Sequence, residues 1–249
     1  MTGARAFMFG GFEFMFFAKD VDVGAPMMML CLHPAAAQSC CRGSRIIGCA
    51  GGEEQPEVAL CESWIREHVV RLGLCPYASA PFVEGKIRYA VSEACDEEEL
   101  LDDFFVEGQI LLEASSEELA TTMLIAPRYE GSIDEFSDLY TWLVDVLEGD
   151  DEPILENGVQ PAFFHPDWAF DGLPGDSAIH FEKRAPIPII NLLRRRDLDA
   201  VVQQGLASGR VVNKEIAEHN AAALEAEGYD ALAAIFATQL AFGTGSGET

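Results

Sequence analysis

The segment Phe163-Phe-His-Pro-Asp-Trp-Ala-Phe170 places one imidazole and one carboxylate inside an aromatic run. A strand predicted just before it would end at His165, and ligands of α/β proteins gather beyond the carboxyl ends of strands. Because imidazole titrates near neutral pH, His165 is a candidate general acid or base, with Asp167 orienting it or acting as a second acid. The alternative is structural: His165 bonds the loop backbone and Asp167 begins a turn.

A second candidate is Cys75, in the segment Leu-Cys-Pro-Tyr-Ala at residues 74–78. A cysteine acts as a nucleophile through its thiolate, which requires a nearby cation to lower the thiol pKa. Arg66 and Arg71 are the nearest basic residues in the sequence. The alternative is that Cys75 is a small buried apolar side chain and that Pro76 only ends the preceding helix.

A third feature is a concentration of positive charge. Arg184 precedes Ala-Pro-Ile-Pro-Ile-Ile, where a helix is predicted to begin, and a guanidinium beside a helix N-terminus binds carboxylate or phosphate well. We therefore expect Arg184 to bind an anionic substrate group, with Arg194 as a further candidate. The alternative is that these arginines pair with acidic surface residues, each pair contributing little. Five of the twelve basic residues after residue 52 belong to the cluster: Lys183, Arg184, Arg194, Arg195 and Arg196.

Several strong catalytic signatures are missing from the sequence. It has no Walker-type phosphate loop, no His-Glu-x-x-His pair, no Gly-x-Ser-x-Gly elbow and no dinucleotide-binding glycine pattern. The closely spaced cysteine pairs of a structural zinc site are also missing, so we predict no metal, and no cofactor follows from the sequence. The odd count of seven cysteines favours a reducing compartment over a secreted disulfide framework.

The overall charge limits the choice of partners. Residues after 52 carry 39 acidic and 12 basic side chains, a net charge of −27. Such a domain is repelled by phosphate backbones and anionic membranes. We therefore predict no nucleic acid as a main partner, unless a local basic patch overrides this field, and an anionic small molecule would need a local basic site. The sequence does not determine the oligomeric state.

The first 55 residues differ from the rest. Their apolar stretches are too short to span a membrane, and Met27–Ala50 contains Arg and Ser but no acidic residue, as in organellar transit peptides. We predict that this extension is either disordered or a targeting segment. A targeting segment would send the protein to a plastid or mitochondrion; without one, we expect the protein in the cytoplasm. Residues 242–249 are predicted to be a flexible tail.

Periodicity and capping signals between residues 56 and 241 predict a single α/β domain. Pro161 in the third strand predicts an edge or a bulge, because proline cannot donate to a sheet ladder. We expect a small mixed sheet of about three to five strands, covered by helices, with a helical C-terminal part. The expected strands are 85–94, 121–126 and 158–164; the expected helices are 56–72, 97–114, 133–147, 189–204, 211–227 and 229–240.

Four ordered segments, at residues 64–78, 121–127, 163–170 and 184–194, resemble the family labelled domain of unknown function 1415. The resemblance spans about Ser63 to Ala200 and implies an α/β domain found in bacteria and photosynthetic eukaryotes. It adds Thr122 to the predicted substrate-binding residues. The positions that match the family pattern are Cys75, Pro76, Thr121, Thr122, His165, Pro166, Arg184, Pro186, Pro188 and Arg194.

The chain also departs from the family pattern. Asn191 and Arg195 stand where the family has His and Glu, and Lys183-Arg184-Ala185-Pro186 replaces Asn-Arg-Ser-Pro. If the family site uses that His and Glu, as metal ligands or as an acid–base pair, the site is altered in this chain. If the site consists of Cys75, His165 and Arg184, it is intact.

The leading hypothesis is a small-molecule enzyme that acts on a carboxylate or phosphate substrate. His165 would be its acid or base, Arg184 would bind the anion, and Cys75 would line the site or act as nucleophile. The alternative is a non-catalytic binding or assembly domain. Its sign would be an exposed apolar patch of several hundred Å².

Overall fold

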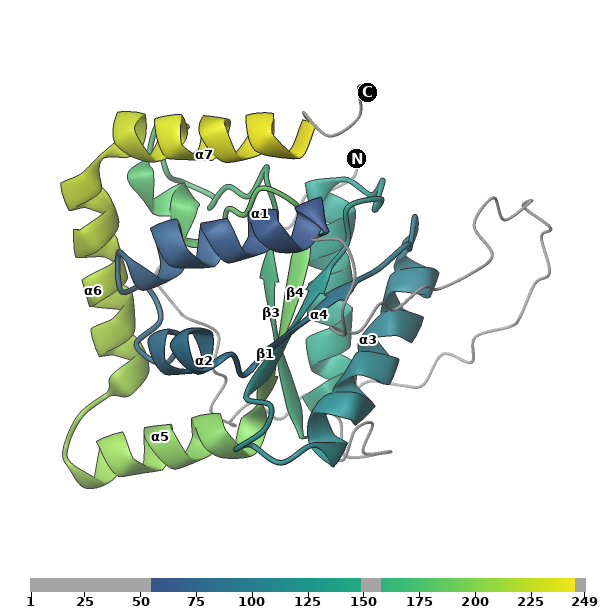
Figure 1. The fold of residues 1–249 in the computed structure, drawn as a ribbon. Coiled ribbons are helices and arrows are strands. Elements are labelled where there is room, and N and C mark those ends of the chain that lie inside the picture. The colour runs from purple at the N-terminus through teal and green to yellow at the C-terminus, as the bar shows by residue number, and fades with distance from the viewer. Residues whose placement is uncertain (1–54, 149–157, 245–249) are drawn as a thin grey trace, which may run out of the picture.

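The computed structural model describes residues 55–148 and 158–244. The extension predicted for the N-terminus therefore lies outside the described residues, apart from Gln55. The last helix continues to Thr244, three residues into the segment predicted as a tail. The described part contains a four-stranded sheet flanked by helices (Figure 1), which confirms the predicted α/β class with a mixed sheet and a helical C-terminal part.

The strand order of the sheet is β1-β2-β4-β3. Strand β1 pairs with β2 in parallel, whereas β4 runs antiparallel to both β2 and β3. Strand β3 lies at an edge, so Pro161 occupies the kind of position that its missing N–H predicts. The strands are β1 (Ile87–Val91), β2 (Thr121–Ile125), β3 (Val159–Phe164) and β4 (Ile189–Arg194).

The parallel pair is joined by helix α3 (Glu97–Glu113), and helix α4 (Ile133–Glu148) leads towards β3. Both predicted capping signals are confirmed. The Asp96 carboxylate accepts the Glu99 N–H at 3.0 Å, and Ser132 and Glu135 bond each other's backbone N–H groups reciprocally.

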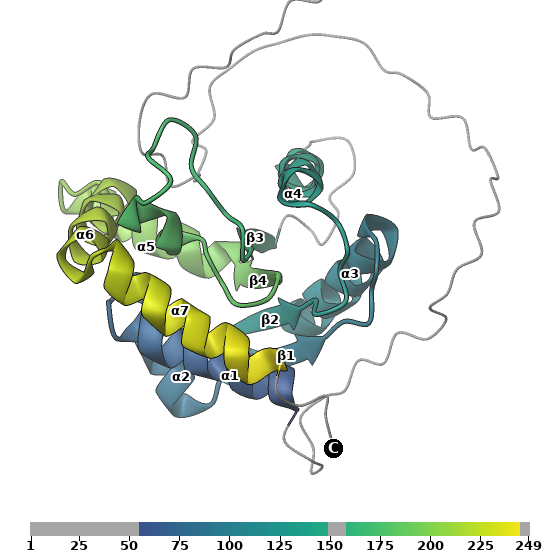
Figure 2. The same ribbon diagram turned by 90° about the horizontal axis from the view of Figure 1, so that it is seen from above.

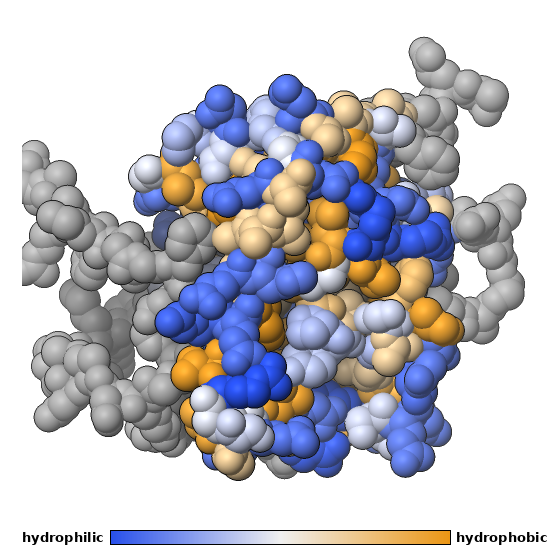
Figure 3. Space-filling view, turned by 90° about the vertical axis from the view of Figure 1, so that its left-hand side faces the viewer, coloured by the Kyte–Doolittle hydropathy of each residue, from blue (hydrophilic) through white to orange (hydrophobic). Residues whose placement is uncertain are grey.

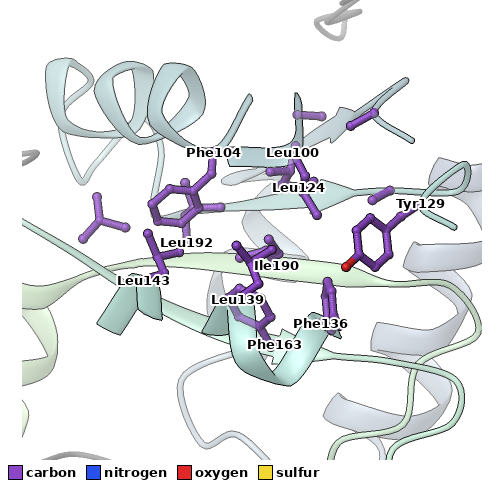
Figure 4. Packing of buried hydrophobic residues seen from close by; sticks show 14 of the residues in the cluster. Leu100, Phe104, Leu124, Tyr129, Phe136, Leu139, Leu143, Phe163, Ile190 and Leu192 are labelled. Carbon is purple, nitrogen blue, oxygen red and sulfur yellow. The ribbon is translucent and has the colours of Figure 1, made fainter. Parts of the chain in front are cut away.

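Helices α3 and α4 cover one face of the sheet, and the other described helices lie on the opposite side or at the end of the sheet (Figure 2). The first face forms the largest core cluster, in which the two helices pack aromatic and aliphatic side chains on alternate residues of the strands (Figure 4). Alternate strand residues point to one face, which is why β4 contributes Ile190 and Leu192 to this core. The Arg194 side chain belongs to the same face.

The opposite face is covered at one end by α1 (Pro56–Trp64) and a π-helical turn, η1 (Ile65–Val70). Together they correspond to the helix predicted over 56–72, and Gly73 follows with φ 68°. Trp64 and Ile65 pack against Tyr89, Met123 and Ile189 of the strands. Short helix α2 (Ser79–Glu84) follows before β1.

One predicted element is wrong. The sequence suggested a helix from Ile189 to Gln204, but Ile189–Arg194 is the central strand β4, and helix α5 (Arg195–Ala207) begins only after it. A short apolar run such as Ile-Ile-Asn-Leu-Leu has no periodicity that separates a buried strand from a buried helix.

The C-terminal helices and the segment before β4 complete the domain. The predicted helices are confirmed as α6 (Val212–Glu227) and α7 (Tyr229–Thr244). A 3-10 helix, η3 (Ala178–Glu182), lies within the segment expected to be irregular and packs against α6. None of the helices in the described ranges has the length and apolar character needed to cross a membrane.

Candidate functional site

His165 follows the last residue of β3 and is buried. Its Nδ1 accepts the Asp167 backbone N–H at 3.1 Å, and its ring packs 5.3 Å from the Phe136 ring. Burial lowers the pKa of the imidazole, while the Asp167 carboxylate acts in the opposite direction. Because Nδ1 is an acceptor, the neutral ring carries its hydrogen on Nε2, which is not sealed from solvent. His165 is thus arranged as a neutral N–H donor rather than as a base.

The turn that carries His165 is bonded to the segment that carries Arg184. The His165 N–H donates to Lys183 O at 3.1 Å, and the Trp168 N–H donates to His165 O at 3.2 Å. The Arg184 Nε then donates to Trp168 O at 2.8 Å. The turn that holds His165 and Asp167 and the later segment that holds Arg184 therefore belong to one hydrogen-bonded unit at the carboxyl end of β3.

Arg184 is held firmly but has no acidic partner. Its guanidinium carbon lies 5.0 Å from the centre of the Phe181 ring, and its backbone oxygen accepts the Trp64 indole N–H at 3.0 Å. No carboxylate in the described ranges pairs with it, although seven of the domain's other basic residues are paired with acids: Arg71, Lys86, Arg88, Arg128, Arg196, Arg210 and Lys214. Its two Nη atoms reach solvent and are available to a ligand.

Cys75 lies in the loop between η1 and α2 and is half-buried. Burial raises the pKa of its thiol, while the backbone N–H groups of Tyr77 and Ala78 act in the opposite direction. Leu74 beside it packs in the same cluster as Phe181, the residue on which Arg184 stacks. The loop is thus connected to the Arg184 region, but the electrostatic activation that a nucleophilic thiolate requires is missing.

Arg194 is buried and bonded entirely to backbone. Its Nη2 donates to Leu111 O at 2.5 Å, to Ala114 O at 2.7 Å and to Leu119 O at 3.0 Å, and its Nε also donates to Leu119 O. The carbonyls of Leu111 and Ala114 are at the C-terminal end of α3, where helix carbonyls lack intrahelical partners, and that of Leu119 is in the loop before β2. The structure gives Arg194 this structural role, and we do not retain it as a substrate-binding residue.

Thr122 is also placed away from any ligand. Its side chain is fully buried in the middle of β2, and within the described chain its Oγ1 has no hydrogen-bond partner. It shares the sheet face with Leu124, which belongs to the core beneath α3 and α4. A ligand would reach Thr122 only through that core, so we do not retain Thr122 as a substrate-binding residue.

Two of the positions that depart from the family pattern are Asn191, in strand β4, and Arg195, the first residue of helix α5. Asn191 in β4 lies beside Thr121 of β2, whose Oγ1 is 2.5 Å from Asn191 Oδ1, and Arg195 donates to Gln160 Oε1 of β3 at 3.0 Å. We call these four residues the Asn191 face. Asn191 is half-buried although β4 is flanked by strands on both sides, so this part of the sheet is reached by solvent.

A metal centre has no support in the part of the chain that the structure describes. No group of three or more His, Cys, Asp or Glu side chains gathers there in a way that could hold an ion. The ring nitrogens of the buried His180, for example, are both used by backbone groups. Its Nδ1 accepts the Phe170 N–H, and its Nε2 bonds Pro174 O.

Sequence reasoning named Arg184 but missed the groups that hold it, Phe181 and the Trp168 carbonyl. A signal for Phe181 was present, because an aromatic residue a few positions before an arginine can stack on its guanidinium. Nothing in the sequence indicates the Trp168 carbonyl as the acceptor, because every residue has a backbone carbonyl.

We compared the chain with known proteins. No curated protein and no solved structure matches it. A family model described as "Protein of unknown function (DUF1415)" matches residues 57–234, which is well over half of the chain and includes every strand and helices α3 to α6 in full. The chain therefore belongs to the family of domain of unknown function 1415.

Proposed function

We propose that this domain binds a small molecule through a carboxylate or phosphate group, with Arg184 as the anion anchor. One observation carries the proposal: a guanidinium fixed at Nε and stacked on a ring presents both Nη atoms without an acidic partner. Arg184 has no acidic partner among the described residues, although the domain has 39 acidic residues and only 12 basic ones. The planar fork of arginine matches the two oxygens of a carboxylate or phosphate.

Fixing the guanidinium in advance favours binding. A long side chain loses rotamer freedom when it grips a ligand, and this cost is lower when Trp168 O and the Phe181 ring already hold it. The same argument distinguishes Arg184 from Arg66, which is exposed and lies 5.5 Å over the Phe82 ring without a fixing hydrogen bond.

His165 supplies the chemistry that this site supports best. A neutral imidazole with its hydrogen on Nε2 donates a hydrogen bond to a ligand oxygen and can stabilise negative charge that develops there. It does not remove a proton, because its other nitrogen already accepts the Asp167 N–H. The site therefore favours binding and polarising an oxygen over the acid/base or thiol catalysis expected from the sequence.

The alternative of an assembly domain has less support. The large apolar side chains that are exposed come from different elements, and on the α6 side of the molecule hydrophobic residues are interspersed with hydrophilic ones (Figure 3). A dominant interface would show them gathered into one patch. The exposed residues are Tyr77, Val83, Val106, Trp142, Leu206, Val211 and Leu240.

The test is calorimetric titration of the full chain with inorganic phosphate and with citrate. We expect Arg184→Gln to weaken binding about tenfold or more, since a charge-assisted hydrogen bond contributes about 1.5–3 kcal/mol. Arg66→Gln is the matched control, because it removes an equal charge that also lies over a phenyl ring. Equal losses in the two variants, or no binding of either probe to the wild type, would contradict the proposal.

A further inference from the structure

Glu182, the last residue of η3, is a half-buried carboxyl that the proposed binding function does not use. Its Oε1 accepts a hydrogen bond from Asn220 Nδ2 at 2.9 Å, across from helix α6. Asn220 is 1% exposed, and its Oδ1 is buried with no hydrogen-bond partner in the described chain. An unpaired buried amide oxygen is costly, about 1–3 kcal/mol, so this arrangement requires an explanation.

The chemistry of the two groups suggests one. A protonated carboxylic acid and a primary amide are complementary: the acid carbonyl accepts from the amide N–H, and the acid O–H donates to the amide oxygen. An ionised carboxylate has no hydrogen to give and leaves the amide oxygen without a donor. One added proton on Glu182 would therefore satisfy both atoms of the Asn220 amide.

We propose that Glu182 is a proton-binding site, neutral in the folded protein near neutral pH, whose carboxyl proton is donated to the buried Asn220 Oδ1 in a cyclic acid–amide pair. This pair joins α6 to the segment that leads directly into Lys183 and Arg184. The inference stands on the geometry of the pair and is independent of whether Arg184 binds an anion.

The surroundings agree with a neutral carboxyl. Burial raises the pKa of Glu182, against the effects of the Asn220 hydrogen bond and the Lys183 charge. Three titratable groups on elements near η3 make other contacts. His68 of η1 bonds Phe181 O, His219 of α6 bonds Leu72 O, and Tyr229 of α7 packs on the Phe181 ring.

The sign of the pH effect follows from proton linkage. Since the folded pKa lies above the ordinary 4.5, the folded state binds more protons than the unfolded state between those two values. Stability from the pair is fully present below pH 4.5 and is lost as pH rises through the folded pKa. Glu182→Gln mimics the protonated acid, because its amide donates to Asn220 Oδ1 and accepts from Nδ2 at every pH.

The experiment is carbon-13 NMR of glutamate carboxyls in the full chain, with the Glu182 signal assigned by its loss in Glu182→Gln. We expect that signal to have the chemical shift of a protonated acid at about pH 6, where an ordinary glutamate is ionised. Denaturant unfolding of Glu182→Gln should match the wild type at low pH and become relatively more stable as pH rises through the Glu182 titration. Glu225→Gln, on the exposed face of α6, is the control for simple loss of charge.

Two results would overturn the inference. The first is an ionised Glu182 carboxyl at about pH 6, which would mean that another group or a water satisfies Asn220 Oδ1. The second is a Glu182→Gln protein that is less stable than the wild type at low pH, since the variant preserves both hydrogen bonds of the pair.

Discussion

Arg184 and Arg194 belong to the same basic stretch of sequence, yet their guanidinium groups are used in different ways. Arg194 is buried and gives four hydrogen bonds to three backbone carbonyls, two at the end of α3 and one in the loop that follows it. Arg184 gives one hydrogen bond, from Nε to Trp168 O, and rests on the Phe181 ring with its Nη atoms reaching solvent. Arg194 stabilises the fold through its backbone contacts, whereas Arg184 is fixed at Nε and its Nη atoms donate to no described residue.

The difference shows that a positive charge in an acidic protein is not by itself evidence of a binding site. What distinguishes the two residues is how many donors the protein itself consumes. An arginine has five N–H donors. At Arg194 the backbone accepts hydrogen bonds from Nε and Nη2 and the residue is buried, whereas no described residue accepts a hydrogen bond from the Nη atoms of Arg184.

The largest expected effect is the loss of stability in Arg194→Met. The substitution leaves the carbonyls of Leu111, Ala114 and Leu119 without their donor, at about 1–3 kcal/mol for each one that stays buried. We expect a loss of about 3 kcal/mol or more in the free energy of unfolding, measured by urea denaturation.

Arg184→Met is the matched control for that comparison. It removes one hydrogen bond and one cation–ring contact, so we expect a loss of about 1–2 kcal/mol. If the two variants were destabilised equally, the contrast between a structural and an available arginine would not hold.

A smaller effect concerns Cys75. Because burial raises its thiol pKa, we expect iodoacetamide to alkylate Cys75 more slowly near neutral pH than it alkylates a peptide thiol. Quantitative mass spectrometry of the Cys75 peptide would measure the rate in the folded chain, with the urea-unfolded chain as reference. Faster labelling in the folded state would restore Cys75 as a nucleophile at the site.

The smallest expected effect is a pH dependence from buried histidines. Burial lowers the pKa values of His68 and His165, so the unfolded chain binds more protons as pH falls below about 6.5. The stability contributed by the neutral rings is present above that pH and is lost below it. We expect His68→Gln, which can still donate to Phe181 O, to reduce the loss of unfolding free energy between about pH 7.5 and pH 5.5. An unchanged slope would show that His68 is not neutral in the folded state.

Much of the fold was predictable because its signals are local. The caps at Asp96 and Ser132 and the edge position of Pro161 each depend on a few neighbouring residues. Strand β4 was not predictable, because Asn191 is the only polar residue in an apolar run that is buried on one face and partly covered on the other. A helix and a central strand both accommodate such a run.

The candidate site was predictable only in part. His165 and Arg184 were named from their residue types, but their roles depend on contacts with the Asp167 and Trp168 backbone. Arg194 was assigned to a substrate because its three carbonyl partners lie at least 75 positions earlier in the chain. Backbone groups carry no side-chain identity, so a sequence does not reveal which carbonyls an arginine will meet.

The most direct test of the distinction between the two arginines is a crystal structure of the full chain grown with phosphate. We expect a phosphate oxygen within hydrogen-bonding distance of the Arg184 Nη atoms, while Arg194 remains bonded to the carbonyls of Leu111, Ala114 and Leu119. A carboxylate paired with Arg184, or phosphate bound elsewhere with the Arg184 Nη atoms left unoccupied, would contradict this account.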